Sequence, residues 1–138
     1  MVALPNSRMT NRRLDQLIRQ LTSDVQGELG FWQINYNSRQ ILIVTDESHD
    51  RMRIMSPILD ETDLTDDDRQ IVLEANFDRA LDAKYAVSRG YLWSVFMHPL
   101  SDLTDTMFLD CVNQVRNLAE NYGSTYTSSE LIFGPGES

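Results

Sequence analysis

The chain has 138 residues, of which 24% are charged and 41% are hydrophobic, and its net charge is −9. This length suits one domain with its own core, and the composition is that of a globular protein. The acidity disfavours binding to nucleic-acid phosphates, which requires a basic surface. Cys111 is the only cysteine, which excludes an intramolecular disulfide and a metal site built from several thiolates.

The sequence indicates where in the cell the protein is found and whether it carries a basic surface. No apolar run approaches the roughly 20 residues that span a bilayer, and the first residues, MVALPNSRMTNRR, lack the apolar stretch of a signal peptide. We therefore expect a cytoplasmic protein of bacterial type. The arginines 8, 12, 13 and 19 are interrupted by Asp15, and we interpret them as a solvated helix face or as partners for acidic groups.

The N-terminal part predicts one helix. Leucine and isoleucine recur at positions 14, 17, 18 and 21, which is the spacing of one helical face. Thr10 is placed to cap this helix, expected over residues 11–23. Gly27 and Gly30 then break the pattern, and we expect no further element before residue 31.

Three strands are expected next. The segments 31–36 and 40–45 are rich in β-branched and aromatic residues and predict a hairpin around the residues NSR. The segment 51–58 alternates and predicts a third strand that ends at Pro57.

An acidic run leads into a second helix. Residues 60–68 carry six carboxylates, and Thr65 is placed to cap a helix whose first turn favours negative charge. A calcium loop starting at Asp63 is rejected, because its sixth position holds Asp68 where the loop requires glycine. The helix is expected to bury four residues, Leu73, Phe77, Ala80 and Leu81.

The C-terminal half predicts a hairpin and a last helix. The strands KYAVS and YLWSVFMHP are joined by a tight turn at Arg89 and Gly90. Thr104 is placed to cap a helix that ends near Gly123. Its apolar stripe consists of Phe108, Cys111, Val112, Val115, Leu118, Ala119 and Tyr122.

These elements predict an α+β fold with the order α-β-β-β-α-β-β-α. Short connections favour a mainly antiparallel sheet packed with helices. We expect a single domain over residues 1–138, with a core at about 10–123 and a tail at 124–138.

The stretch TDESHDRMRIMSPI (45–58) raises the question of a metal or catalytic cluster. A zinc site needs three or four histidine, cysteine or carboxylate ligands. His49 and His98 are the only histidines and lack helical spacing, so we interpret DESHD as a solvated turn. A site of two histidines and a carboxylate stays open on geometry.

Arg51 and Arg53 share one face of the third strand, because they lie two positions apart. One interpretation pairs them structurally with acidic residues on a neighbouring element, such as Asp78 or Asp82. The other makes them a site for an anion or a peptide carboxylate, since guanidinium groups match such ligands.

Catalytic signals are weak. Cys111 lies in an apolar stripe, where cysteine usually behaves as a small hydrophobe. No G-x-S-x-G motif and no glycine-rich phosphate loop occurs. We therefore expect a non-enzymatic protein with no catalytic residues, no metal and no cofactor.

The strand 91–98 is apolar on both faces, which is the strongest functional signal. Tyr91, Trp93, Val95 and Met97 point one way, while the alternate positions, with Leu92 and Phe96, point the other. A strand of this kind requires cover on both faces. Unless the three helices divide between the two faces, these four residues form a surface for a partner or a second copy.

The element order resembles the secretion-chaperone fold of the CesT (Tir chaperone) family and the related YbjN family. The second helix ends at Asn76 and Phe77, and the later strand exits through His98, Pro99 and Leu100. The match covers about residues 10–123 and is carried by these segments: GFWQINY, ILIVTDESHDRMRIMSPI, LEANFDRALDAKYAVSRGYLWSVFMHPL and NQVRNLAENYG.

The resemblance implies a small acidic homodimer without a cofactor. Secretion chaperones of this fold bind an extended segment of a client protein through apolar patches and sheet edges. We therefore expect a protein-binding module that holds an extended client by strand addition and apolar pockets. The alternative is a YbjN-like regulatory or scaffold protein that binds a folded partner.

Overall fold

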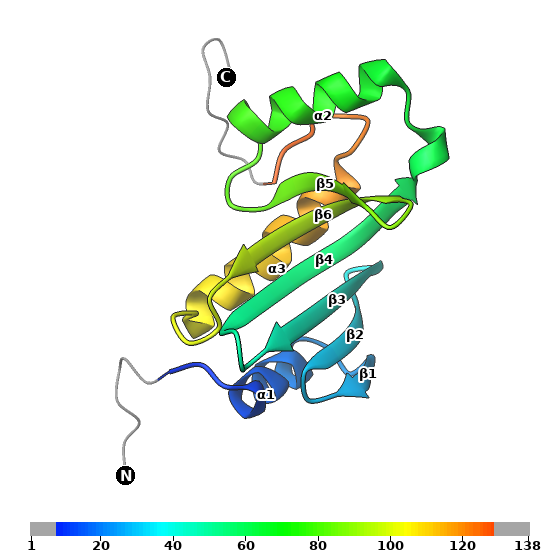
Figure 1. Cartoon of the computed structure of the whole chain (residues 1–138). Coiled ribbons are helices and arrows are strands. Elements are labelled where there is room, and N and C mark those ends of the chain that lie inside the picture. Colours follow the sequence, from blue (N-terminus) through cyan, green and yellow to red (C-terminus); the bar gives the residue numbers. More distant parts are fainter. Residues whose placement is uncertain (1–7, 129–138) are drawn as a thin grey trace.

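The computed structural model describes residues 8–128, which form three α-helices, a short 3-10 helix and one antiparallel sheet (Figure 1). None of these helices is long and apolar enough to cross a membrane. The elements are α1 (Asn11–Leu21), β1 (Val25–Glu28), β2 (Phe31–Tyr36), β3 (Arg39–Asp46), β4 (Arg51–Asp60), the 3-10 helix η1 (Glu61–Asp63), α2 (Asp66–Asp78), β5 (Lys84–Ser88), β6 (Tyr91–His98) and α3 (Asp105–Glu120).

The six strands are ordered β1-β2-β3-β4-β6-β5, and every neighbouring pair is antiparallel. The predicted α+β class and antiparallel sheet are therefore confirmed. The structure contains one strand that the sequence pattern does not predict: β1 pairs with β2 and gives the order α-β-β-β-β-α-β-β-α. Its sequence, VQGE, lacks a strand signal because it contains only one β-branched residue and a glycine.

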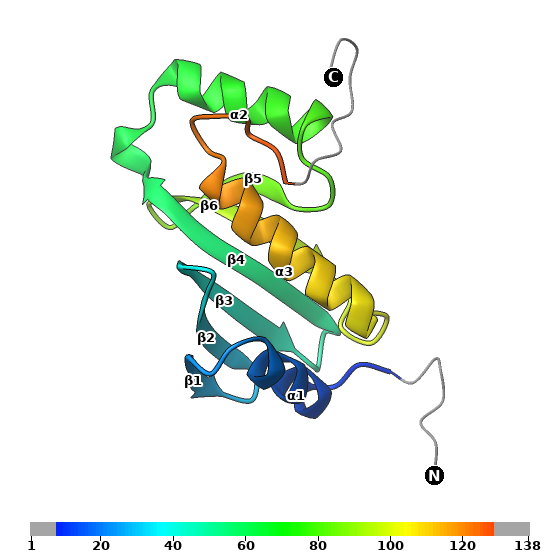
Figure 2. The same ribbon diagram turned by 180° about the vertical axis from the view of Figure 1, so that it is seen from behind.

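The core lies on one face of the sheet, under α1 and α3 (Figure 2). Four cross-strand neighbours on this face are fully or nearly buried, in the row Trp32, Ile43, Ile54 and Phe96. The three buried residues of α1 and five buried residues of α3 belong to the same core cluster, namely Leu14, Leu17 and Ile18 with Phe108, Cys111, Val112, Val115 and Leu118. Cys111 is 1% exposed within it, which confirms its predicted place in the core.

The predicted helix caps are confirmed. The hydroxyl groups of Thr10, Thr65 and Thr104 each accept a hydrogen bond from the backbone N–H three residues later. At Thr65 the carboxylate of Asp68 also accepts from the cap N–H, which completes a capping box. Local sequence signals therefore determined where all three helices begin.

The predicted end of the third strand at Pro57 is wrong. β4 continues to Asp60, because the pairing of β4 with β6 shifts register between Pro57 and Leu59. A register shift leaves a backbone position without a ladder hydrogen bond, and proline, which has no N–H, is tolerated there.

The predicted buried face of the second helix is also wrong in part. Leu73 is 64% exposed and Phe77 is 88% exposed, whereas Val72 and Ala75 are buried. The reason is the position of α2, which lies beyond the edge strand β5 rather than over the sheet (Figure 1). Of the other two predicted positions, Ala80 is buried and Leu81 is partly buried.

The segment after α3 packs against the loop that leads into β5. The backbone N–H of Leu81 donates to the hydroxyl of Ser128 at 2.8 Å, and Arg79 donates to the carbonyl of Thr125 at 3.2 Å. Thr127 and Ser128 are buried. Residues 124–128 of the predicted tail therefore belong to the fold, and the remaining tail residues, 129–138, lie outside the described part.

Candidate functional site

The sheet face opposite α1 and α3 is not covered by a helix of the described chain, and we call it the open face. In Figure 1 the strands β4 and β6 lie in front of α3, so this face is turned to the viewer. Tyr91, Trp93, Val95 and Met97 lie on it, while Leu92, Ser94 and Phe96 are buried beneath the helices. The predicted division of β6 into two faces is therefore confirmed.

Residues from the neighbouring strands extend the apolar surface. Leu42 pairs with Met55, and Met55 pairs with Val95, so one row crosses three strands. None of these side chains belongs to the core cluster or packs against it. The sequence placed β6 on this surface, but only the strand register adds the further members, which are Phe31, Leu42, Val44, Met55 and Pro57.

The aromatic end of the open face is ordered. The rings of Tyr91 and Trp93 meet edge to face, with their centroids 5.9 Å apart. The indole N–H of Trp93 donates to the carbonyl of Ser88 at 2.8 Å, so this N–H needs no hydrogen bond from a bound protein. The indole ring is thereby held in a defined position from which it can offer apolar area to a ligand.

The opposite end of the open face combines apolar and cationic groups. A shallow depression of about 460 Å³ is lined by Val44, Met97, Arg51 and Arg53, among others. Both arginines are exposed, and within residues 8–128 neither has a carboxylate within ion-pair distance. The suggested pairing with Asp78 or Asp82 is therefore not found, and both guanidinium groups are available to a ligand.

The turn beside this depression is held by its own side chains. Ser48 donates to Asp46 at 2.7 Å, and the Nδ1 atom of His49 lies 2.8 Å from the same carboxylate. These hydrogen bonds lower the pKa of Asp46 to about 2. In the described chain, no third metal-binding group accompanies Asp46 and His49, and His98 directs Nδ1 to the carbonyl of Pro99.

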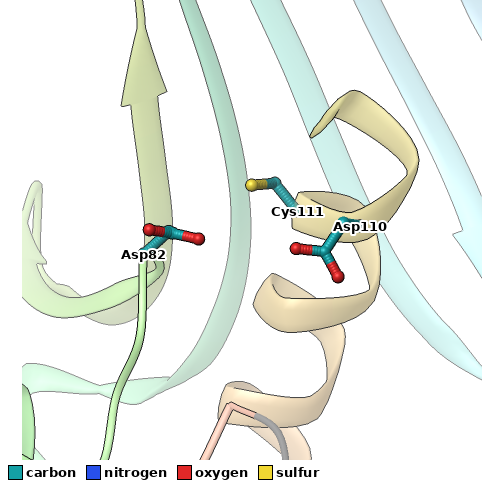
Figure 3. Close-up of side chains that lie close together, drawn as sticks. All are labelled: Asp82, Asp110 and Cys111. Carbon is teal, nitrogen blue, oxygen red and sulfur yellow. The ribbon is translucent and has the colours of Figure 1, made fainter. Parts of the chain in front are cut away.

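One group of metal-binding side chain types does occur elsewhere. Asp82, which precedes β5, lies close to Asp110 and Cys111 of α3 (Figure 3), with ligand atoms within 4.8 Å of one another. Gln114 explains this proximity, because its amide nitrogen donates to both carboxylates at 2.9 and 2.8 Å. Its oxygen accepts from the N–H groups of Asp82 and Ala83, so Gln114 joins the loop to α3.

The surroundings of the thiol in this group favour its protonated form. Burial, together with the negative charges of Asp82 and Asp110, raises the pKa of Cys111 to about 12. The thiolate is the nucleophile and the metal ligand, so a protonated thiol is unsuited to either role at neutral pH. We assign Gln114 and its two carboxylates to a structural link.

The outer edge of the sheet at β5 is partly occupied. The side chain of Asn76 donates to the carbonyl of Tyr85 at 3.0 Å and accepts from its N–H at 2.8 Å. Both outward-facing backbone groups of this residue are therefore used. An added strand would have to displace Asn76, so side-chain contacts on the open face are more accessible to a partner than backbone pairing at β5.

A scan against protein-family models and a search of curated proteins found no match to this chain.

Proposed function

We propose that the chain is a non-enzymatic, chaperone-like protein-binding module of the cytoplasm, and that its open face holds a segment of a client protein. One observation carries the proposal: a continuous apolar surface crosses β3, β4 and β6 without cover from the described helices. Surfaces of this kind on soluble proteins are typical of sites that bind other proteins.

The chemistry of the surface suggests how a client is held. Trp93 and Tyr91 offer aromatic area at one end, and Met97 offers a flexible thioether at the other. Arg51 and Arg53 add charge-assisted hydrogen bonds to carboxylates. We expect clients to bind through apolar segments that carry acidic residues.

Site-specific photocrosslinking tests this proposal. A photoreactive amino acid at Met97, which is 61% exposed, should crosslink a client segment in a cell lysate. The same amino acid at Arg12, on the outer side of α1, is the matched control. A short synthetic peptide copying the crosslinked segment should bind the parent protein, and Met97→Asp should weaken that binding while Arg12→Asp does not.

Two results would count against the proposal. Equal crosslinking from both positions would show that the open face has no preference for clients. A client that binds only as a folded protein, with no affinity in its peptide, would instead favour the scaffold alternative.

A further inference from the structure

The outer face of α2 is a second exposed apolar surface. Leu73 and Phe77 lie four residues apart on one side of the helix and are 64% and 88% exposed. They line a shallow hollow with Gln70, Glu74 and Asp78. Within the described chain, neither acidic residue forms an ion pair, and Glu74 accepts one hydrogen bond, from the exposed side chain of Gln70 at 2.9 Å. This side of α2 therefore combines apolar and negatively charged groups.

The open face has the complementary composition. Arg51 and Arg53 carry positive charge in a protein whose net charge is −9, and they adjoin Val44 and Met97. Asp46, the carboxylate in the same depression, is already engaged by its hydrogen bonds to the turn. An acidic, apolar helix is the ligand that these groups match.

The spacing of the charges also agrees. Two residues along a strand are about 6.6 Å apart, which separates Arg51 from Arg53. Four residues along a helix rise about 6 Å, which separates Glu74 from Asp78. Leu73 and Phe77 have that same separation. The carboxylates of Glu74 and Asp78 can therefore lie opposite Arg51 and Arg53. Leu73 and Phe77 can likewise lie opposite apolar residues that are two positions apart on a strand of the open face.

The two surfaces cannot meet within one chain. The Asn76 side chain bonds to Tyr85, and the Nζ atom of Lys84 donates to the carbonyl of Asn76 at 2.7 Å. These contacts hold α2 beside the edge strand β5. A contact between α2 and the open face therefore requires a second copy of the chain.

We propose that self-association seats α2 of one copy on the open face of another, with Glu74 and Asp78 against Arg51 and Arg53. Leu73 and Phe77 then pack on the apolar rows, and the helix supplies the layer that the sheet lacks on this side. When each of two copies seats its α2 on the open face of the other, both contacts are satisfied within a symmetric dimer. The proposal goes beyond client binding, with which this contact would compete, and requires no client.

Charge reversal with mixing tests the proposal by sedimentation velocity. The parent should sediment as a species heavier than the 15.9 kDa monomer. The variants R51E/R53E and E74K/D78K, each alone, place like charges against each other and should lose at least tenfold in affinity, about 1.4 kcal/mol. An equimolar mixture should associate again, because the reversed open face of one variant matches the reversed helix of the other.

R12E/R19E is the control, because it reverses two exposed arginines on α1 and should associate as the parent does. A monomeric parent, or a mixture that stays monomeric, would overturn the proposal. Unchanged association of R51E/R53E would show that α2 pairs with itself. Unchanged association of E74K/D78K would show that the open faces pair with each other. Either result replaces the proposed contact.

Discussion

Asp46 and Asp50, which bracket the turn after β3, have different roles. Asp46 orders the turn itself, through Ser48 and His49. Asp50 has a φ of 55° and accepts hydrogen bonds from the backbone N–H and the hydroxyl of Ser101, both at 2.7 Å. Asp50 therefore ties the turn to the loop that precedes α3, a long-range contact that the local sequence does not reveal.

We predict that Asp50→Ala lowers the melting temperature clearly, whereas the neighbouring His49→Ala change leaves it nearly unaltered. The hydrogen bonds from Ser101 lower the pKa of Asp50 below its usual range. Its contribution to stability is therefore present above the pKa of the unfolded chain and is lost as the pH falls. Thermal melts from neutral to acidic pH should show the difference in melting temperature between the parent and Asp50→Ala becoming smaller, down to the cost of placing alanine at this positive φ. A difference that does not change with pH would contradict this role.

The buried thiol gives a prediction at alkaline pH. Burial raises the pKa of Cys111 from 9.0 to about 12, so its neutral form stabilises the fold below pH 9 and this contribution is lost between those values. Cys111→Ala should lower stability at neutral pH by leaving a small cavity. Above pH 9, the stability of this variant should fall less steeply with pH than that of the parent. Urea titrations at several pH values measure both effects.

At the level of single elements, the β1–β2 hairpin depends on one glycine. Gly27 has a φ of 105°, and a Cβ atom there would lie 2.2 Å from the carbonyl oxygen of Phe31. Gly123 has a φ of 86° with no atom within 4 Å of its Cβ position. Alanine at position 27 would therefore meet both backbone strain and a steric collision, whereas alanine at position 123 would meet backbone strain alone.

We predict that Gly123→Ala costs about 1 kcal/mol, the usual cost of placing alanine at a positive φ. Gly27→Ala should cost more, because the backbone of the hairpin has to move. Urea denaturation gives the two free energies of unfolding, and hydrogen exchange should show early loss of protection in β1 and β2 for Gly27→Ala alone. Equal costs would contradict a collision.

The features that the sequence predicted are those with local causes. Thr10, Thr65 and Thr104 were identified as caps because the motif requires only the next three residues, and Trp93 was assigned a face because strands alternate. The orientation of α2 was not predictable in this way. Whether Val72 or Leu73 packs inward depends on where β5 lies, and that position is set by contacts distant in sequence.

The orientation of α2 gives a paired prediction. At protein concentrations low enough for the chain to be monomeric, Phe77→Ser should change the free energy of unfolding by no more than about 0.5 kcal/mol, because the ring is 88% exposed. Val72→Ala, five residues earlier and 5% exposed, should cost about 2 kcal/mol through lost burial and a cavity. Urea denaturation compares the two variants; a large cost for Phe77→Ser would show that α2 packs by the face predicted from sequence.

For the molecule as a whole, the helices α1 and α3 make one layer and the sheet makes the other (Figure 2). Most sheets with an apolar second face are covered on that side as well. Here the side that no helix within residues 8–128 covers carries Arg51 and Arg53, two positive charges on an otherwise acidic chain. Assembly and client binding are therefore proposed for one surface, and both should respond to ionic strength.

We predict that self-association weakens as sodium chloride is raised, because the proposed contact pairs exposed charges that salt screens. Sedimentation velocity over a salt series measures this dependence, and R12E/R19E should show the same slope as the parent. A purely apolar contact would be unaffected or strengthened by sodium sulfate. Association that grows with either salt would contradict a role for Arg51 and Arg53.

The amide of Asn76 also affects how the molecule behaves when crowded. A bare edge strand can template fibrils by recruiting the edges of other molecules. Asn76 acts at Tyr85 as a one-residue substitute for a neighbouring strand, since it both donates to and accepts from the backbone. Aspartate at this position would still accept from the N–H but could not donate to the carbonyl, so the carboxamide is what withholds both backbone groups of Tyr85 from an incoming strand.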